Sequence, residues 1–246
     1  MRYSARLSHP VIRSREQSLW LSAAFDALNS TESKTGLTLF DDRLRVLRVA
    51  ATYALNDGDN ANLATLEASQ GLHALGASQA GDTNLSRANG RPDFTKFAAS
   101  LTRQQRLVGP FDVQLAVAGQ KAVQPLLLPE QFPLGGARFG RAYDPAEIVG
   151  DDAAAGSIEL RYNGTVDNRL LRSYQLYTFS DFGTVWNMGV NDGTQRQSLA
   201  SVGGGIRVGL PRNIAASLEL DKALTRQVAA EGGKPVRVFV TLAVPF

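Results

Sequence analysis

The residues best placed for a chemical role are a cation and an anion that lie in two different kinds of sequence. Arg141 lies in a stretch rich in Gly and Pro, whereas Asp181 lies in a stretch where apolar and polar residues alternate. A guanidinium and a carboxylate often form two parallel hydrogen bonds, so their pairing fixes orientation as well as adding energy. Chemistry of this kind holds two segments together and transforms no substrate.

Other kinds of site find little support in the sequence. The chain has no cysteine, which excludes disulfides, thiolate metal sites and cysteine nucleophiles. Its two histidines, His9 and His73, are far apart in the sequence. Neither Gly135-Gly136 nor Gly203–Gly205 supplies the Lys-Ser/Thr of a phosphate loop, and the latter triplet is interpreted as a bend or bulge in a strand. Asp151-Asp152 is interpreted as a pair of loop acids, with a calcium site as the less favoured alternative. We therefore expect no catalytic residue, no metal and no cofactor.

Charge and hydropathy narrow the class of protein. The net charge of +3, from 26 basic and 23 acidic residues, is too balanced to indicate nucleic-acid binding. No stretch approaches the roughly 18 consecutive apolar residues of a membrane helix. The mean hydropathy of −0.14 still permits a membrane β-barrel, because its strands alternate apolar and polar residues and average out as mildly hydrophilic.

Alternation with a period of two dominates the chain. At its C-terminal end, Val236, Val238 and Val240 fall on one face, with Arg237 and Thr241 on the other. Similar segments, most of them about 9–14 residues long as a tilted membrane strand requires, predict about eleven strands. They lie near 1–9, 17–29, 43–56, 62–72, 94–105, 111–121, 155–163, 173–187, 197–210, 213–224 and 236–246. The expected fold is all-β, an antiparallel transmembrane β-barrel.

The connections between these strands alternate between short and long. Short ones are expected near 10–16, 57–61, 106–110, 164–172 and 211–212, and longer ones near 30–42, 73–93, 122–154, 188–196 and 225–235. Outer-membrane barrels have short periplasmic turns and longer extracellular loops, so this rhythm places the C-terminus on the periplasmic side. The connection 122–154 is too long for a simple turn, and its Gly and aromatic residues indicate an ordered, packed loop.

The long loop and a later strand carry a resemblance to a known family. The loop contains Leu134-Gly-Gly-Ala-Arg-Phe-Gly-Arg-Ala-Tyr-Asp144 and then Gly150-Asp-Asp152, and the strand contains Phe179-Ser-Asp-Phe-Gly183. Together with the terminal Phe246 they resemble the C-terminal barrel of two-partner secretion transporters, the hemolysin secretion/activation family. In that superfamily a long loop folds into the pore, its tip carries Val-Arg-Gly-Tyr/Phe, and a later strand carries Phe-x-Asp-x-Gly. Here Gly140 stands where the Val is usual and Ala142 where the Gly is usual.

The resemblance implies a role for each matching residue. Arg141, Tyr143 and Asp181 would latch the loop 122–154 inside the barrel, and Phe246 would be the signal that the barrel-assembly machinery recognises. A supporting motif would be formed by Gly135, Gly136, Gly140, Phe179 and Gly183. If the strand 173–187 keeps its alternation, Asp181 faces the lumen beside Phe179, and Tyr143 and Phe179 could pack around the ion pair. The alternative is that Arg141 is a solvated loop residue and Asp181 an ordinary pore-lining acid.

The resemblance also implies a longer protein. Family barrels have roughly sixteen strands and periplasmic POTRA domains before them, so residues 1–246 would be the C-terminal part of the barrel. No signal peptide follows Met1, which leads us to expect a fragment or a truncated product. Because two unpaired sheet edges are costly in lipid, we expect no stable insertion of the chain alone.

The implied function is nucleotide-independent secretion through the outer membrane of a Gram-negative bacterium. The expected partners are a secreted exoprotein of the hemolysin or adhesin type, outer-membrane lipid and the barrel-assembly machinery, with no nucleic acid. Three alternatives stay open: a barrel-assembly factor of the same superfamily, a passive porin or barrel-anchored enzyme, and a soluble all-β domain.

Overall fold

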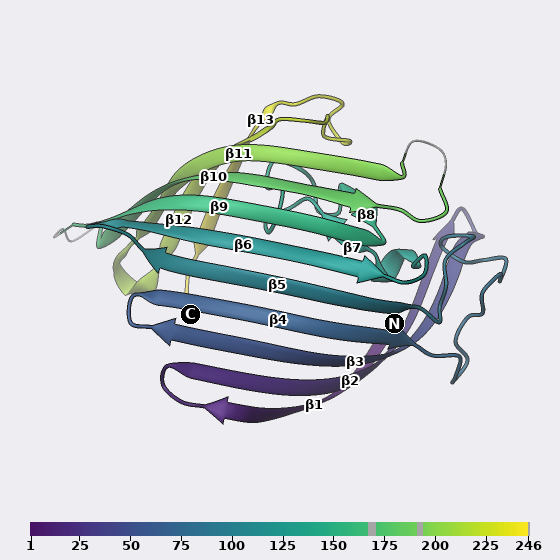
Figure 1. Ribbon diagram of the computed structural model, residues 1–246. Helices are drawn as coiled ribbons and strands as arrows, with labels where there is room; N and C mark the ends of the chain where they lie inside the picture. The colour runs from purple at the N-terminus through teal and green to yellow at the C-terminus, as the bar shows by residue number, and fades with distance from the viewer. Residues whose placement is uncertain (167–170, 191–193, 246) are drawn as a thin grey trace.

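A single large antiparallel sheet organises the chain (Figure 1). The computed structural model describes residues 1–166, 171–190 and 194–245. Within them, eleven strands follow one another in the order β1-β2-β3-β4-β5-β6-β9-β10-β11-β12-β13, so each long strand pairs with its neighbours in the sequence. The all-β antiparallel fold predicted from the alternation is confirmed, since neighbouring strands joined by hairpins are the simplest way to pair such segments.

The strand bounds lie close to the predicted ones. The strands of the large sheet are β1 (Arg2–Arg13), β2 (Gln17–Lys34), β3 (Leu37–Asp57), β4 (Asn60–Gly71), β5 (Thr95–Arg106), β6 (Phe111–Ala122), β9 (Asp152–Thr165), β10 (Ser173–Trp186), β11 (Arg196–Gly209), β12 (Ala215–Ala223) and β13 (Val236–Ala243). Two short strands, β7 (Phe132–Leu134) and β8 (Ile148–Gly150), pair separately, and two 3-10 helices are η1 (Leu128–Glu130) and η2 (Pro211–Asn213).

The predicted long loop at 30–42 is wrong. β2 and β3 continue as a paired ladder to Lys34 and Leu37, and a tight turn at Thr35-Gly36 joins them. Both turn residues have positive φ, 51° and 80°, as the common two-residue turn of type I′ between hairpin strands requires. The polar residues of this segment favour a loop when the sequence is considered alone. A strand that extends past the membrane edge, however, also carries polar residues on both faces.

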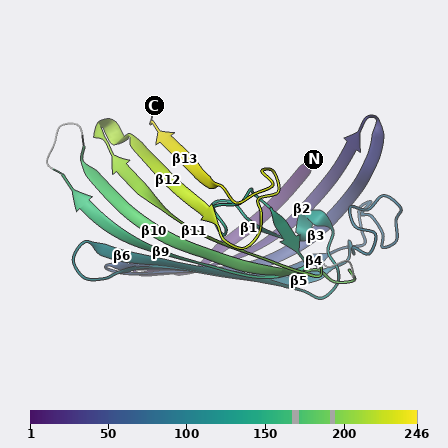
Figure 2. The ribbon, with the colours of Figure 1, turned by 90° about the horizontal axis from the view of Figure 1, so that it is seen from above.

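The sheet curls into a trough with an inner and an outer face (Figure 2). β1 and β13 form its two edges, so the sheet is not closed within the described residues. On β10 the alternating residues Tyr177, Phe179 and Asp181 are buried, whereas Leu176 and Phe182, which point to the other face, are 46% and 56% exposed. The outer face is thus apolar and uncovered, as a lipid-facing surface is, and the inner face carries the polar residues.

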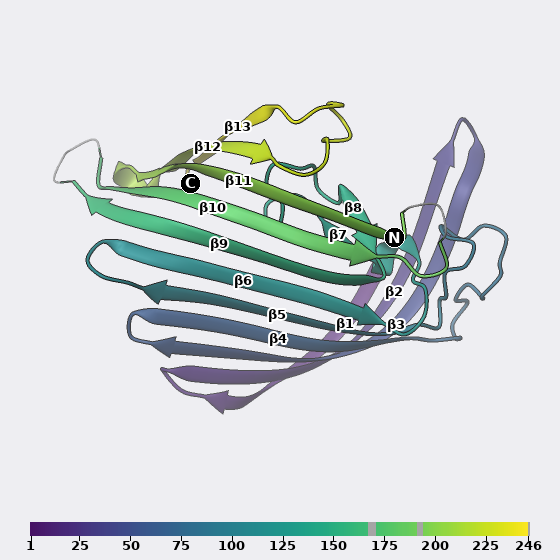
Figure 3. The same ribbon diagram turned by 45° about the horizontal axis from the view of Figure 1, so that its top comes forward.

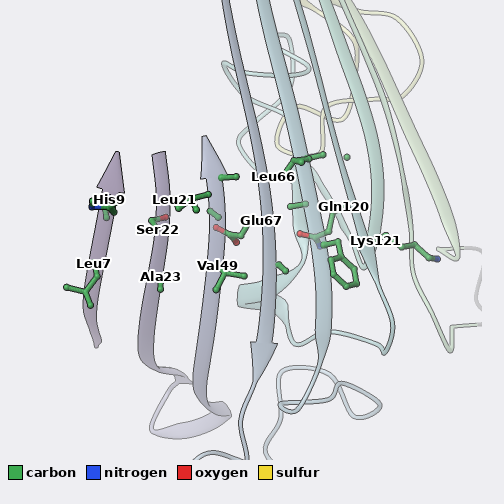
Figure 4. Close-up of a pocket in the computed structure, with 18 of the residues that line it drawn as sticks. Leu7, His9, Leu21, Ser22, Ala23, Val49, Leu66, Glu67, Gln120 and Lys121 are labelled. Atoms are coloured by element: carbon green, nitrogen blue, oxygen red, sulfur yellow. The ribbon is translucent and has the colours of Figure 1, made fainter. Parts of the chain in front are cut away.

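A broad hollow lies along β1 to β6 and reaches Ala153 of β9 (Figure 4). Its lining combines exposed apolar side chains such as Leu7, Leu66 and Phe97 with small residues and with the polar Glu67 and Gln120. None of the helices among the described residues combines the length and apolar character needed to cross a membrane.

The connection between β6 and β9 folds back onto the inner face (Figure 3). Its two short strands, β7 and β8, contact β10, and β7 also contacts β9. The loop packs there through a buried cluster that includes Leu134, Phe139 and Tyr143 with Val185 and Leu199 of the wall. The expectation of an ordered and packed loop, made from its composition, matches this arrangement.

Candidate functional site

The site is built around the tip of this long loop, residues 135–147. β7 and β8 form an antiparallel hairpin in which Leu134 is opposite Ile148, and the tip projects from it. Inside the tip, the N–H of Tyr143 donates to the carbonyl of Gly140 at 2.9 Å and the N–H of Gly135 to that of Phe139 at 3.0 Å. These bonds make the tip a compact unit that presents its side chains to the wall.

Three glycines predicted as a supporting motif give the tip its shape. Gly135, Gly136 and Gly140 have φ values of 115°, 85° and 91°, in the left-handed region that favours glycine. A Cβ on Gly140 would also lie 2.6 Å from a methyl carbon of Leu199. Ala142, which stands where the family motif has Gly, is not among the residues with positive φ, so the motif needs no glycine there.

The structure brings Arg141 and Asp181 together. The Arg141 Nε and Nη2 lie 3.2 and 3.3 Å from the two carboxylate oxygens of Asp181. The backbone N–H groups of Gly140 and Arg141 donate to the same carboxylate at 3.1 and 3.0 Å. The Asp181 side chain is 0% exposed and that of Arg141 11%. Asp181 therefore holds the backbone of the tip as well as its side chain, and we call this set of contacts the latch.

A second carboxylate, which the sequence reasoning missed, shares the guanidinium. Arg141 Nη1 donates to Glu159 and Nη2 donates to Ser157 at 3.2 Å. In the β9–β10 ladder Ser157 is opposite Asp181 and Glu159 opposite Phe179, so all four face the lumen. The alternation of the predicted strand 155–163 places Ser157, Glu159 and Arg161 on its polar face, and this signal could have found Glu159.

The ionic state of Arg141 follows from its neighbours. Burial lowers the pKa of Arg141, but the carboxylates of Asp181 and Glu159 more than offset this and raise that pKa above its ordinary value. The guanidinium is therefore charged. A buried cation with two carboxylate partners is stable in its place, and it is costly to leave either partner alone.

An aromatic ring completes the surroundings of Arg141. The guanidinium carbon lies 3.5 Å from the centre of the Phe179 ring, a close cation–π contact. A Cβ on Gly203 would lie 2.5 Å from that ring, so this glycine provides the space the ring occupies. The β10–β11 ladder runs without a register shift through Gly203–Gly205, so there is no β-bulge at these glycines.

Tyr143 lies differently from the expectation that it packs around the ion pair. Its hydroxyl donates to the carbonyl of Ala200 at 3.2 Å and accepts from the N–H of Arg226 at 3.3 Å. The ring is 1% exposed. Tyr143 therefore ties the tip to β11 and to the segment that follows β12, beyond the latch itself.

Gly183 makes room for the hairpin that carries the tip. A Cβ at this position would lie 2.6 Å from a methyl carbon of Leu134 in β7. The space at this glycine is thus used by the side chain of Leu134. Phe246, the predicted assembly signal, lies outside the described residues.

Replacing Gly183 by valine is expected to push β7 off the wall. Overpacking of a filled site costs about 1–3 kcal/mol, and here the strain falls on the hairpin rather than on the sheet. Limited proteolysis of the loop should speed up severalfold while the sheet remains intact. Thr184→Val, on the outer face of the same strand, is the matched control, and equal proteolysis of the two variants would contradict this account.

A second set of ion pairs holds the beginning of the loop. Glu130 of η1 lies 2.6 Å from Arg48 of β3 and 2.9 Å from Lys96 of β5. Arg48 also pairs with Asp26 of β2 at 2.8 Å. The Glu130 side chain is 4% exposed. The loop is therefore anchored to the opposite half of the sheet independently of the latch.

Replacing Glu130 by alanine is expected to free the start of the loop. It leaves two buried cations with fewer acceptors, a loss of roughly 3 kcal/mol for a buried pair broken on one side. The midpoint of denaturation and protease cleavage near residues 123–131 measure the effect. Glu67→Ala, at a more exposed carboxylate 3.6 Å from Arg48, should change the stability by well under half as much. Equal losses would show that Glu130 acts only as a surface charge.

Asp151 forms a third anchor, at the end of the loop. Its fully buried carboxylate accepts from Arg87 Nη1 at 2.6 Å and from the backbone N–H groups of Leu126 and Met188 at 2.8 Å each. Gln131 donates to it at 3.1 Å. One side chain thus joins the long loop to the β4–β5 and β10–β11 connections. Donors surround it, and within the described residues no cluster suited to a metal ion occurs, so the calcium alternative has no support.

The fold and the site define a class of protein. A sheet with an apolar outer face, an ionic inner face and a loop pinned inside by buried ion pairs is the wall of a transmembrane β-barrel. A family model described as haemolysin secretion/activation protein ShlB/FhaC/HecB matches residues 1–208. The chain belongs to this family, which comprises secretion proteins rather than enzymes, and it is part of an outer-membrane barrel of a Gram-negative bacterium.

Solved structures agree with this fold. CdiB from Escherichia coli matches 98% of the chain with a TM-score of 0.73 at 15% identity, and CdiB from Acinetobacter baumannii matches 98% with 0.75 at 15%. The crystal structure of BamA from Haemophilus ducreyi lacking POTRA domains 1-3 gives a lower TM-score of 0.51 at 11% identity over 98% of the chain and 62% of that chain. The chain spans 44% and 41% of the two CdiB chains. Among curated proteins, none matches.

Proposed function

We propose that this chain is the C-terminal part of an outer-membrane transporter that secretes a large exoprotein by two-partner secretion. The proposal rests on the family to which the chain belongs. The fold of the chain is also more similar to the two CdiB barrels than to BamA, as the TM-scores indicate, and this agrees with the proposal. The exoprotein, of the hemolysin or adhesin type, would cross unfolded through the barrel without nucleotide.

Within this function, residues 122–154 act as a pore loop and the latch as its lock. The observation that carries this role is the number of hydrogen bonds on one buried carboxylate: Asp181 binds the side chain of Arg141 and two backbone N–H groups of the tip. A loop held in this way fills the lumen, so an exoprotein can pass only after the tip moves. Latching and release are then the two states of the channel.

The terminal residue and the remaining partners belong to the same proposal. Phe246 at the C-terminus would be recognised by the barrel-assembly machinery during insertion. The outer faces of the strands would contact outer-membrane lipid, as the exposed Leu176 and Phe182 support. Within the described residues β1 and β13 are the edges of the sheet, and a closed barrel would need further strands between them.

The test is secretion in a strain that expresses the intact transporter with the exoprotein encoded beside it. Deletion of the transporter gene should abolish release of the exoprotein into the medium, and the plasmid-borne gene should restore it. The profile of other outer-membrane proteins should stay normal in the deletion strain, whereas loss of a general insertase would alter it. Normal secretion with loss of other barrels would instead identify an assembly factor.

A further inference from the structure

The groups that hold Arg141 belong to the wall and not to the loop. We call Ser157, Glu159, Phe179 and Asp181 the arginine seat; they lie on the neighbouring strands β9 and β10. We propose that this seat binds arginine side chains of the polypeptide in transit, with Arg141 as its resting occupant. The inference rests on the proposed function and adds a chemical feature of the passenger that the channel recognises.

The seat is held in place without help from the loop. The Ser157 hydroxyl donates to Asp181 at 2.7 Å. Arg161 Nε and Arg207 Nη1 donate to Glu159 at 2.6 and 2.8 Å. The antiparallel ladder of β9 and β10 has no register shift. The seat therefore keeps its shape when Arg141 leaves, and a preformed site loses little affinity to reorganisation.

The vacated seat attracts cations. The inner faces of β9 to β12 carry the carboxylates Glu159, Asp181, Glu219 and Asp221 and the guanidinium groups of Arg161 and Arg207. Without Asp221, which is buried and has no hydrogen-bond donor among the described residues, three carboxylates against two guanidinium groups leave a net charge of −1 once Arg141 has moved away. A concave wall of one sign, bounded by apolar lipid, concentrates ions of the opposite sign.

One buried carboxyl group of this wall has no hydrogen-bond donor even in the latched state. Asp221 is 0% exposed, and neither of its oxygens has a hydrogen-bond partner among the described residues. It lies beside the seat, since a Cβ on Gly203 would be 2.3 Å from Asp221 Oδ1 and 2.5 Å from the Phe179 ring. Ionisation of a buried carboxyl group without donors is costly, and a cation placed beside it offsets that cost. The wall thus offers more acceptors than Arg141 uses.

The geometry selects arginine over lysine. The guanidinium carbon of Arg141 lies 3.5 Å from the centre of the Phe179 ring, while the guanidinium nitrogens donate to Asp181, Glu159 and Ser157. Only a planar fork can stack on a ring and donate to two carboxylates at once, whereas an ammonium is a compact, strongly hydrated charge. Because the passenger and Arg141 compete for one seat, an arginine in transit stabilises the released loop.

Single-channel recording in planar lipid bilayers tests this with the intact transporter. The probes are the capped peptides acetyl-Gly-Arg-Gly-amide and its citrulline analogue, which has the same shape without the charge, at millimolar concentration. The arginine peptide should raise the fraction of time that the channel is open at least about fivefold over the citrulline peptide. The corresponding lysine peptide should have an intermediate effect. In Asp181→Asn the difference between the peptides should vanish. Equal effects of arginine and citrulline peptides on the wild type would overturn the proposal.

A direct binding measurement complements the recording. Arg141→Ala empties the seat without touching the wall, so a fluorescent arginine peptide should bind this variant more tightly than the wild type, with a Kd in the range of ~1 mM. Adding Asp181→Asn should weaken binding about tenfold or more. Absence of binding to Arg141→Ala would sink the inference. If secretion nevertheless depends on the transporter, the proposed function stands; if secretion does not depend on it, the proposed function fails by itself.

Discussion

Secretion of the exoprotein is expected to fall at least about tenfold when Arg141 is replaced by alanine in the intact transporter. Asp181 and Glu159 then lose the cation they share, and breaking a buried pair on one side costs roughly 3–5 kcal/mol. Two of the hydrogen bonds to Asp181 come from the tip backbone and remain. The tip should therefore loosen rather than leave its place entirely, which chymotrypsin cleavage at Phe139 and Tyr143 would report.

Two further variants separate charge from geometry. Arg141→Lys keeps the charge but loses the stacking and the fork, so secretion and protection should be intermediate. Asp181→Asn in the Arg141→Ala background should add much less than either change alone, because the two groups act as a pair. Additive effects would mean that Arg141 and Asp181 contribute separately. Unchanged secretion together with unchanged protection in Arg141→Ala would remove the latch from the mechanism.

Replacing Asp151 by alanine is expected to loosen three connections at once. It leaves the Arg87 guanidinium and the N–H groups of Leu126 and Met188 without their acceptor in a buried site. The cost is about 3–5 kcal/mol for the ion pair, with further loss for the orphaned N–H groups. Hydrogen exchange should increase in residues 86–91, 125–131 and 187–189 together, while the strands stay protected.

Lys121→Ala provides the matched control for the Asp151 variant. Lys121 pairs with the adjacent Asp152, but its side chain is 71% exposed. An exposed ion pair contributes at most ~1 kcal/mol, so exchange in the three connections should not change. If Asp151→Ala affected only the segment next to it, the carboxylate would be a local contact rather than the point that joins the connections.

Most of the fold could be predicted from the sequence, and the reason is physical. In a barrel wall the two faces meet lipid and lumen, so apolar and polar residues must alternate along each strand. The eleven segments found in this way reappear as strands, with ends that shift by a few residues. The turn at Thr35-Gly36 was missed because alternation fades where β2 and β3 leave the membrane and both faces meet water.

The residues that form the site could be predicted only in part from the sequence. The sequence motif singled out Arg141 and Asp181, and the glycines at 135, 136 and 140 could be read from their conformational freedom. Glu159 was missed, although it lies with Ser157 and Arg161 on the polar face of the predicted strand 155–163. Glu130 and Arg87 gave no signal of their own, because lone charged residues in or near a loop are usually solvated.

The sequence by itself determined the strands, their order and the residue types of the loop tip, because these depend on local alternation and on single residues. Only the tertiary structure decided which charges meet. Arg141 lies between Asp181 and Glu159, Glu130 lies between Arg48 and Lys96, and Tyr143 reaches β11. Those contacts depend on the curvature of the sheet and the path of the loop across it, which bring together residues that no spacing along the chain relates.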